Sequence, residues 1–311
     1  MRPDDWHLTE DLDDFLARAG DFLRSRPASH IMPLTAARRL RTRGAAAYGV
    51  QAPLFGRLER GGEVHAAFYR LPSRGLGPTP LTPGQADALA ARLAALGQSL
   101  PYVSADDATA TAFAEAWRRH TGATATPRVR LRLYRLGTLI PPEPFPAGRG
   151  RLAGEQDQER LLSWCAGFAS DVGETVSIDA DTWAGTRFAD KRYTFWETPD
   201  GTPVSMAGLN PSVAGVVQVD PVYTPAPLRG RGYAAAVTVE VSRAARAAGA
   251  MEVVLFTNAV NATSNALYQR IGYVLVTEWT VYDFAYAEAQ TETAVEAGTR
   301  ARAGAQARAE A

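Results

Sequence analysis

The chain has 311 residues, of which 46% are hydrophobic and 21% charged, enough apolar side chains for an ordinary buried core in about two domains. Basic and acidic residues number 33 each, so the formal net charge is zero and the chain lacks the broad basic surface of a general nucleic-acid binder. One cysteine and four scattered histidines exclude an internal disulfide and show no metal-ligand spacing, so we expect no metal.

The first residues of the chain do not resemble a secretory signal. They are acidic, where such a signal would be basic and then apolar. No apolar run in the sequence approaches the roughly 18 residues that a membrane span needs. We therefore expect a cytoplasmic protein without a membrane partner.

The first half is predicted to alternate helices and strands. Thr9 and the pair Thr82-Pro83 are helix-start signals, because apolar residues follow each of them at helical spacing. A hairpin is predicted where two strand-like segments meet at Gly61-Gly62. In chain order we expect a helix from residue 9 to about 27, a helix over about 34–43, the hairpin within 53–71, a helix over about 82–96, a strand at Tyr102, a helix through Phe113 and Trp117, and a strand over 129–136.

A segment rich in proline and glycine, residues 138–150, is predicted to be a stiff linker that few contacts cross. Beyond it we expect helices at about 156–168 and 179–188, strands at 192–197, 203–209 and 216–224, a helix at about 231–248, a strand at 251–257, a helix at 264–270 and a strand at 274–284. This order predicts two tandem copies of one fold, 1–137 and 151–286. Two unrelated α/β domains are the alternative. Residues 287–311 lack large apolar side chains and are predicted to be a disordered tail.

A glycine-containing loop, Leu228–Ala234, lies between a predicted strand and a helix that begins near Gly232. Glycines allow a sharp turn that brings successive N–H groups together, and the helix N-terminus adds partial positive charge. This combination is typical of a phosphate or diphosphate site. The alternatives are a turn without a ligand and a dinucleotide site, since Gly230–Ala235 also fits G-x-G-x-x-A. Two observations argue against the dinucleotide site. Several residues separate the loop from the strand before it, whereas a dinucleotide turn follows its strand at once, and the acidic residue Glu252 begins the next strand, whereas it should end it.

Two motifs in this half resemble the GNAT superfamily of N-acetyltransferases. The first superfamily pattern, [RQ]-x-x-G-x-[GA], is matched by Arg229-Gly-Arg-Gly232-Tyr-Ala234. The second motif is resembled by Asn261-Ala-Thr-Ser-Asn-Ala-Leu-Tyr268-Gln-Arg-Ile-Gly-Tyr273. The resemblance covers about residues 150–285, and residues 1–137 look like a degenerate copy. It implies an α/β (α+β) fold of two tandem GNAT-like domains, each a mixed twisted sheet flanked by helices, with acetyl-CoA or another acyl-CoA as co-substrate. The implied cofactor-binding residues are Val222, Tyr223 and Thr224 along the pantetheine arm, Arg229, Gly230, Arg231, Gly232, Tyr233, Ala234 and Ala235 around the diphosphate, Asn261 at the pantetheine amide or thioester, and Ser264 or Asn265 as the cap of the next helix.

The resemblance also implies that Tyr268 is the general acid that protonates the leaving thiolate. A phenol pKa of about 10 against a thiol pKa of about 8.5 permits this transfer once water is excluded. The alternative is a core tyrosine. The general base is less defined, because the superfamily's carboxylate position corresponds to Gln218 here; Asp220 is our first choice, and Glu197, Glu174 or a water chain are alternatives. The predicted catalytic set is Tyr268, Asn261 and Asp220.

The predicted reaction is direct attack of an amine on the thioester, without an acyl-enzyme, because the lone Cys165 lies on a helix far along the chain from the loop. The acceptor is expected to be a small-molecule or peptide amine. An acyl carrier protein as donor and a non-catalytic CoA-binding module are the alternatives. Residues 1–137 lack the phosphate motif before their third helix, so we expect them to bind no CoA. Their expected role is to shape the acceptor cleft or to pack as a pseudo-dimer partner of the second half. The protein is expected to be a monomer or homodimer. Aromatic candidates for the acceptor pocket, or otherwise for the core, are Trp183, Phe195, Trp196 and Trp279.

Overall fold

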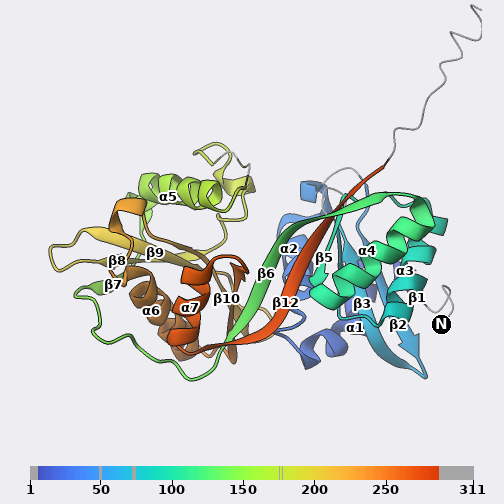
Figure 1. Cartoon of the computed structure of the whole chain (residues 1–311), viewed down its shortest axis with the longest axis horizontal. Helices are drawn as coiled ribbons and strands as arrows, with labels where there is room; N and C mark the ends of the chain where they lie inside the picture. Colours follow the sequence, from blue (N-terminus) through green and yellow to red (C-terminus); the bar gives the residue numbers. More distant parts are fainter. Residues whose placement is uncertain (1–5, 49–50, 72–74, 175, 177, 287–311) are drawn as a thin grey trace, which may run out of the picture.

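The computed structural model describes residues 6–48, 51–71, 75–174, 176 and 178–286. Their strands form one 12-stranded mixed sheet in the order β1-β2-β3-β4-β5-β12-β6-β11-β10-β9-β8-β7 (Figure 1). The first half contains β1 (Trp6–Thr9), α1 (Leu12–Ser25), α2 (Ile31–Arg43), β2 (Leu54–Arg60), β3 (Glu63–Arg70), β4 (Leu76–Pro78), α3 (Pro83–Ala95), β5 (Tyr102–Asp106), α4 (Asp107–Thr121) and β6 (Thr124–Leu136). The second half contains β7 (Arg149–Leu152), α5 (Gln158–Asp171), β8 (Arg192–Glu197), β9 (Pro203–Leu209), β10 (Val216–Tyr223), α6 (Tyr233–Ala247), β11 (Glu252–Asn258), α7 (Ala262–Arg270) and β12 (Tyr273–Ala285).

The two halves of the sheet have the same topology. β1 to β5 follow one another from one edge, and β7 to β11 follow one another from the other edge. Each series ends in a parallel pair, β4 with β5 and β10 with β11, and its other neighbouring strands are antiparallel. This internal symmetry confirms the predicted mixed α/β fold, in which helices flank a twisted sheet.

The last strand of each half pairs with the parallel pair of the other half. β6 pairs with β11 through registers such as Val254↔Arg135, and β12 pairs with β5 through registers such as Val281↔Ser104. β6 and β12 also pair with each other along nearly their whole length, and Figure 1 shows them side by side at the junction of the halves. Neither half therefore has a complete sheet without a strand from the other. The predicted limits of 1–137 and 151–286 stay a prediction about sequence units.

Both faces of the sheet are buried under helices. On β3, Ala66 and Phe68 join the core beneath α3 and α4, while Ala67 and Tyr69 join the core beneath α1 and α2, as strand alternation requires. In the second half α5 covers one face, and α6 and α7 cover the other (Figure 1). Among the described residues no helix is both long and apolar enough to cross a membrane.

Most predicted elements are confirmed, with three differences. The helix predicted near 179–188 is wrong, because this stretch holds only the 3-10 turn Trp183–Gly185. There Asp179 and Thr182 each accept the other's backbone N–H with a side-chain oxygen, which competes with helix formation. The N-cap of the first helix is Asp11 and not Thr9, since the Asp11 carboxylate accepts from the N–H groups two and three residues on. The short strands β1, β4 and β7 were not predicted.

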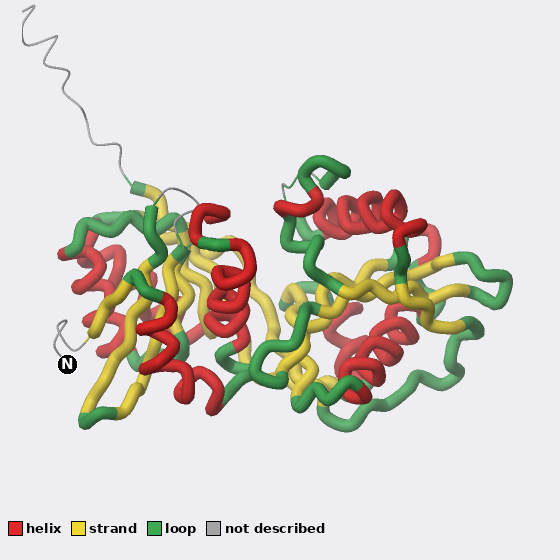
Figure 2. Tube along the Cα trace, turned by 180° about the vertical axis from the view of Figure 1, so that it is seen from behind, coloured by secondary structure: helices red, strands yellow, loops and turns green. Residues whose placement is uncertain are grey.

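The linker is packed more closely than predicted. Gly137 and Ile140 donate backbone hydrogen bonds to the carbonyls of Gly272 and Ile271, and the Phe145 ring lies edge-on to Trp196 with centroids 5.4 Å apart. Its last residues, from Arg149, already belong to β7. The segment between β6 and β7 therefore runs along the second half, as Figures 1 and 2 show. The predicted tail, 287–311, lies outside the described residues.

Candidate functional site

The loop before α6 presents a row of unpaired N–H groups. Gly230 and Gly232 have φ angles of 78° and 79°, a left-handed conformation that favours glycine. Gly232 is the N-cap of α6, and within the described residues the backbone N–H groups of residues 230–235 donate to no protein acceptor. The positive end of the helix dipole lies at the same point. This arrangement suits an anion such as a diphosphate.

The corresponding helix of the first half has a different N-terminus. Pro83, the first residue of α3, has no N–H, and Thr82 and Gln85 satisfy each other's backbone N–H groups in a capping box. In addition, Leu81 donates its N–H to Thr109 Oγ1 at 2.8 Å, which ties the chain after β4 to α4. Within the part of the chain that the structure describes, the N-terminus of α3 therefore lacks the row of free amides found before α6.

β10 and β11 separate beside the loop. Their parallel pairing runs from Val216↔Glu252 to Gln218↔Val254 and goes no further, although both strands continue. On its other side β10 pairs with β9, with a register shift between Val219 and Val222. Proline cannot donate to a ladder, and Pro221 lies within this shift. The predicted opening next to Val222 to Thr224 is thus present.

Three of the predicted ligands in this region are engaged within the protein, and the first is Tyr223, whose carbonyl accepts from Ser205 Oγ at 3.0 Å. The Thr224 carbonyl accepts from Arg229 Nε at 2.9 Å, and the Thr224 hydroxyl bonds to Ser205 Oγ at 2.8 Å. The Arg229 guanidinium also pairs with Asp171 of α5. Arg229 therefore braces the loop against β10 and α5, whereas the exposed Arg231 donates only a long bond of 3.4 Å to the Pro227 carbonyl among the described residues.

The start of α7 corrects the predicted cap. Asn261 is the N-cap, and its side chain accepts from Ser264 N–H at 3.0 Å. The buried Asn265 amide donates to the carbonyls of Asn258, Ala259 and Asn261 and shapes the turn. Neither Ser264 nor Asn265 caps the helix, and Asn265 is not placed to bind a cofactor because its side chain is fully used inside the protein.

Tyr268 is a buried residue of α7 whose ring lies edge-on to Tyr273, with centroids 6.1 Å apart. Burial, then the neighbouring Tyr273 and Asp220, raise the pKa of Tyr268 above its ordinary value. No hydrogen bond of its hydroxyl is found within the described part of the chain. Tyr268 is therefore protonated at neutral pH, the state a general acid needs.

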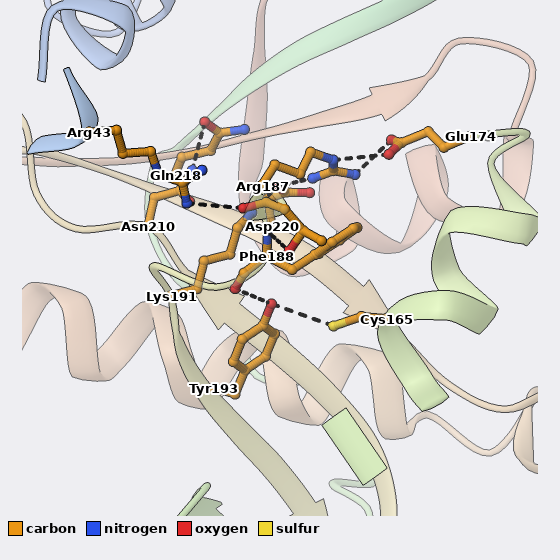
Figure 3. Close-up of polar contacts among 11 residues, drawn as sticks. Arg43, Cys165, Glu174, Arg187, Phe188, Lys191, Tyr193, Asn210, Gln218 and Asp220 are labelled. Carbon is orange, nitrogen blue, oxygen red and sulfur yellow. Dashed lines mark hydrogen bonds and ion pairs between the residues drawn. The ribbon is translucent and has the colours of Figure 1, made fainter. Parts of the chain in front are cut away.

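Asp220 is paired with two cations and does not suit the predicted base (Figure 3). Its Oδ2 accepts from Lys191 Nζ and from Arg187 Nη1, the latter at 2.5 Å, and Arg187 also pairs with Glu174 at 2.7 Å. Burial alone would raise the pKa of Asp220, but the charges of Lys191 and Arg187 lower it to about 2. A carboxylate with such a pKa is a weak proton acceptor near neutrality, so the two ion pairs argue against Asp220 as the base, and that role stays a prediction.

The alternative bases and the aromatic candidates also have structural contacts. Glu197 pairs with Arg151 at 2.5 Å, and Glu174 pairs with Arg187 as above. Phe195 and Trp196 are buried in the core. Trp279 lies in the part of β12 that pairs with β5, and its Nε1 donates to Ser104 Oγ at 2.8 Å, so it does not face the loop before α6. Of these aromatic candidates Trp183 alone is partly exposed.

Cys165 has no features of a nucleophile. Its side chain is fully buried on α5, and burial raises the pKa of the thiol to about 11. Its sulfur lies 3.5 Å from the Tyr193 hydroxyl. A neutral, enclosed thiol of this kind is inert.

A parallel strand pair that splays apart, joined in the chain by a helix whose first amides are unpaired, is the arrangement of the GNAT fold. In agreement, residues 159–273 match the family model of the Acetyltransferase (GNAT) family, which implies acyl transfer from an acyl-CoA. The second half of the chain is therefore similar to the Acetyltransferase (GNAT) family, and the whole chain has the GNAT fold. No curated protein matches the sequence.

Solved structures share the fold over both halves. A GCN5-related N-acetyltransferase from Sphaerobacter thermophilus is 17% identical, with a TM-score of 0.58 and coverage of 91% of this chain and 96% of that one. A tandem GNAT protein from the clavulanic acid biosynthesis pathway is 13% identical, with a TM-score of 0.54 and coverage of 90% and 98%. A GNAT-family acetyltransferase from Colwellia psychrerythraea is 12% identical, with a TM-score of 0.53 and coverage of 90% and 99%. The likeness thus extends beyond the matched domain to the tandem arrangement.

Proposed function

We propose that this protein transfers an acetyl group from acetyl-CoA to an amine acceptor, with the chemistry in its second half. The observation that supports this best is the row of unpaired N–H groups over residues 230–235, next to the point where β10 leaves β11. Charge-assisted hydrogen bonds to a diphosphate are worth about 1.5–3 kcal/mol each, so such a row is sufficient to anchor the co-substrate.

In this proposal the co-substrate supplies a thioester, and the chain supplies binding and proton transfer. The open edge of β10 at Val222 and Tyr223 offers backbone groups to the pantetheine arm. Tyr268 gives its proton to the departing sulfur. The acceptor amine loses its proton to solvent water, because Asp220, Glu174 and Glu197 are all held in ion pairs with cations. The carboxylates therefore organise the site and do not act as the base.

The acceptor is proposed to be a small-molecule or peptide amine, reached without an acyl-enzyme because Cys165 is buried. The first half is proposed to bind no CoA, on the support of its capped α3 N-terminus. An acyl carrier protein as donor would give acyl transfer from carrier-bound pantetheine but not from free acetyl-CoA. A non-catalytic module would bind acetyl-CoA without releasing thiol.

Calorimetric titration with acetyl-CoA, followed by thiol release in the presence of an amine panel, tests the proposal. Gly230→Ala is the informative variant, because a methyl group there meets nothing within 4 Å but the positive φ of 78° disfavours alanine and disturbs the amides. Gly249→Ala is its matched control, since Gly249 also has a positive φ of 89°, also has nothing within 4 Å, and lies past the other end of α6.

Both variants should lose similar stability, about 1 kcal/mol. We expect Gly230→Ala alone to weaken acetyl-CoA binding, by about tenfold, equivalent to the loss of about 1.4 kcal/mol. If the wild-type protein takes up neither acetyl-CoA nor CoA, the proposed function is wrong.

A further inference from the structure

Arg43, the last residue of α2 in the first half, directs its guanidinium to one segment of the second half (Figure 3). Its Nε and Nη2 donate to Asp190 Oδ2 at 3.1 and 2.7 Å. Nη2 also donates to the Thr186 carbonyl at 3.0 Å, and Nη1 donates to the Gly185 carbonyl at 3.3 Å. The side chain is 22% exposed, so these contacts are partly shielded from water. One residue of the first half thus holds several groups of the second half.

Residues 185–191, which we call the bridging segment, have little regular structure of their own. The segment leaves the 3-10 turn Trp183–Gly185, and no helix or strand covers residues 186–191 before β8 begins. Its local hydrogen bonds centre on Thr186, whose Oγ1 donates to the Trp183 carbonyl at 2.8 Å and accepts from Phe188 N–H at 3.2 Å. A segment with so few internal bonds depends on contacts from other elements for its position.

The bridging segment carries both cations that pair with Asp220. Arg187 is stacked over the Phe188 ring at 4.3 Å, and the side chain of Lys191 is fully buried. Asp220 lies on β10 within the register shift between Val219 and Val222, two residues past Gln218, where the pairing with β11 ends. The chain of contacts therefore runs from α2, through the bridging segment, to the bend of β10.

We propose that Arg43 is a positioning residue for the second-half site: it anchors the bridging segment across the junction of the halves, and so keeps Lys191 and Arg187 on Asp220 at the bend of β10. The anchoring stands on the contacts alone, while its consequence for acyl transfer rests on the proposed function. Through Arg43, the first half would position residues of the second-half site although it binds no ligand itself.

The composition of the chain provides a direct probe, because Lys191 is its only lysine. An amine-reactive reagent such as acetic anhydride therefore reports on Lys191, with the α-amino group as internal reference, and peptide mass spectrometry measures the labelling rate against pH. The charged and titratable groups that act on Lys191 are Asp220 of β10, Arg187, Arg39 of α2 and the Cys165 thiol of α5. Burial lowers the pKa of Lys191 to about 8, in spite of the opposing effect of Asp220.

We expect Arg43→Gln to raise the labelling rate of Lys191 at the plateau of its pH profile by about tenfold or more, because local opening of the bridging segment exposes the amine. The midpoint should also move from near pH 8 toward the ordinary value of about 10.4. Arg41→Gln is the matched control, because Arg41 lies on the same helix but pairs at 2.5 Å with Asp13 inside the first half. This control should leave the Lys191 profile unchanged.

Asp190→Asn should shift the profile in the same direction as Arg43→Gln, and the double variant should shift it no further than the larger single change. A folded Arg43→Gln protein, with an unchanged circular dichroism spectrum, that keeps the wild-type plateau and midpoint would overturn the proposal. If that variant does not fold, the same criterion applies to Asp190→Asn, which leaves Arg43 in place.

Titration with acetyl-CoA separates this inference from the proposed function. We expect Arg43→Gln to bind acetyl-CoA as the wild type does, because no hydrogen bond or ion pair joins the bridging segment to residues 229–235 in the described structure. Thiol release with an amine should fall at least about fivefold, since the reacting end of the site is disturbed. Absence of acetyl-CoA uptake by the wild type would refute the proposed function and leave the labelling result as the test of the anchor.

Discussion

The Tyr134 hydroxyl of β6 donates to Asn265 Oδ1 of α7 at 3.1 Å and accepts from Gln269 Nε2 at 3.2 Å. Tyr134 belongs to the first half by sequence, yet its side chain completes the hydrogen bonding of the buried amide that shapes the turn before α7. The exchange of β6 makes this contact possible. The geometry of the helix that carries Tyr268 therefore depends on a strand from the other half.

Tyr134→Phe should destabilise the protein by about 1–3 kcal/mol, because it leaves the buried Asn265 oxygen without its donor. Urea unfolding followed by circular dichroism measures this change. Tyr282→Phe is the control, since the Tyr282 hydroxyl bonds to the half-buried Thr111 at 3.2 Å, where water can replace it. Equal losses in the two variants would contradict the role given to Tyr134.

Tyr268→Phe should lower kcat by about 100-fold if Tyr268 is the general acid, in the range typical of acid–base catalysis. The Kd of acetyl-CoA should not change. Stability should change by less than about 0.5 kcal/mol, because the hydroxyl has no hydrogen bond within the described residues. Thiol release kinetics and calorimetry measure the two quantities.

Tyr273→Phe is the matched control for Tyr268→Phe. Its ring contacts Tyr268, but its hydroxyl bonds to Ser242 Oγ at 2.8 Å, so its removal should cost about 1 kcal/mol of stability and leave kcat unchanged. If Tyr268→Phe keeps full turnover, Tyr268 is a core residue and not the acid.

Acid titration should report the ion pairs of Asp220. Because the pKa of Asp220 is lowered to about 2 from an ordinary 3.8, its contribution to stability is complete above about pH 4 and is lost as the pH falls toward 2. Asp220→Asn should lose that part of the pH dependence, and at pH 7 should destabilise the protein by about 3–5 kcal/mol, since Lys191 remains buried without its partner. Urea unfolding between pH 7 and pH 2 measures both effects.

Replacement of both partners should recover stability. Lys191→Met with Asp220→Asn removes the buried cation as well as the carboxylate, so the double variant should be more stable than Asp220→Asn alone. Additive losses would show that Asp220 and Lys191 are not energetically coupled.

Fragments cut in the linker after Pro142 should not fold separately. Each would expose an unpaired edge of its parallel strand pair, because β12 covers β5 and β6 covers β11. We expect each fragment to show no cooperative thermal unfolding, and the two mixed to recover a folded complex by size exclusion and circular dichroism. A cooperative transition in residues 143–286 alone would contradict the exchange of strands.

Predictions from the sequence held where the signal was local. The helix start at Thr82-Pro83, the hairpin at Gly61-Gly62 and the glycine loop before α6 depend on residues close together in the chain, and the structure confirms each. The prediction of a helix near 179–188 was wrong, also for a local reason. The side-chain oxygens of Asp179 and Thr182 accept each other's backbone N–H groups, which competes with helix formation.

The roles of charged residues required distances that no sequence pattern contains. Asp220 occupies a position close to that of a base, but Lys191 and Arg187 reach it from a segment about thirty residues earlier, and their charges lower its pKa to about 2. The same holds for Arg43, which contacts Asp190 across 147 residues of chain. Such pairs form only when the sheet has brought the segments together.

The sequence by itself determined most of the order of helices and strands and the glycine-containing turn before α6, because caps, turns and hydrophobic periodicity act over a few residues. Only the tertiary structure decided which half each final strand completes. β6 and β12 have similar length and similar strand-forming patterns, so either could close either sheet locally, and the long antiparallel pairing of the two selects the exchange. That pairing joins the first half to the site of the second.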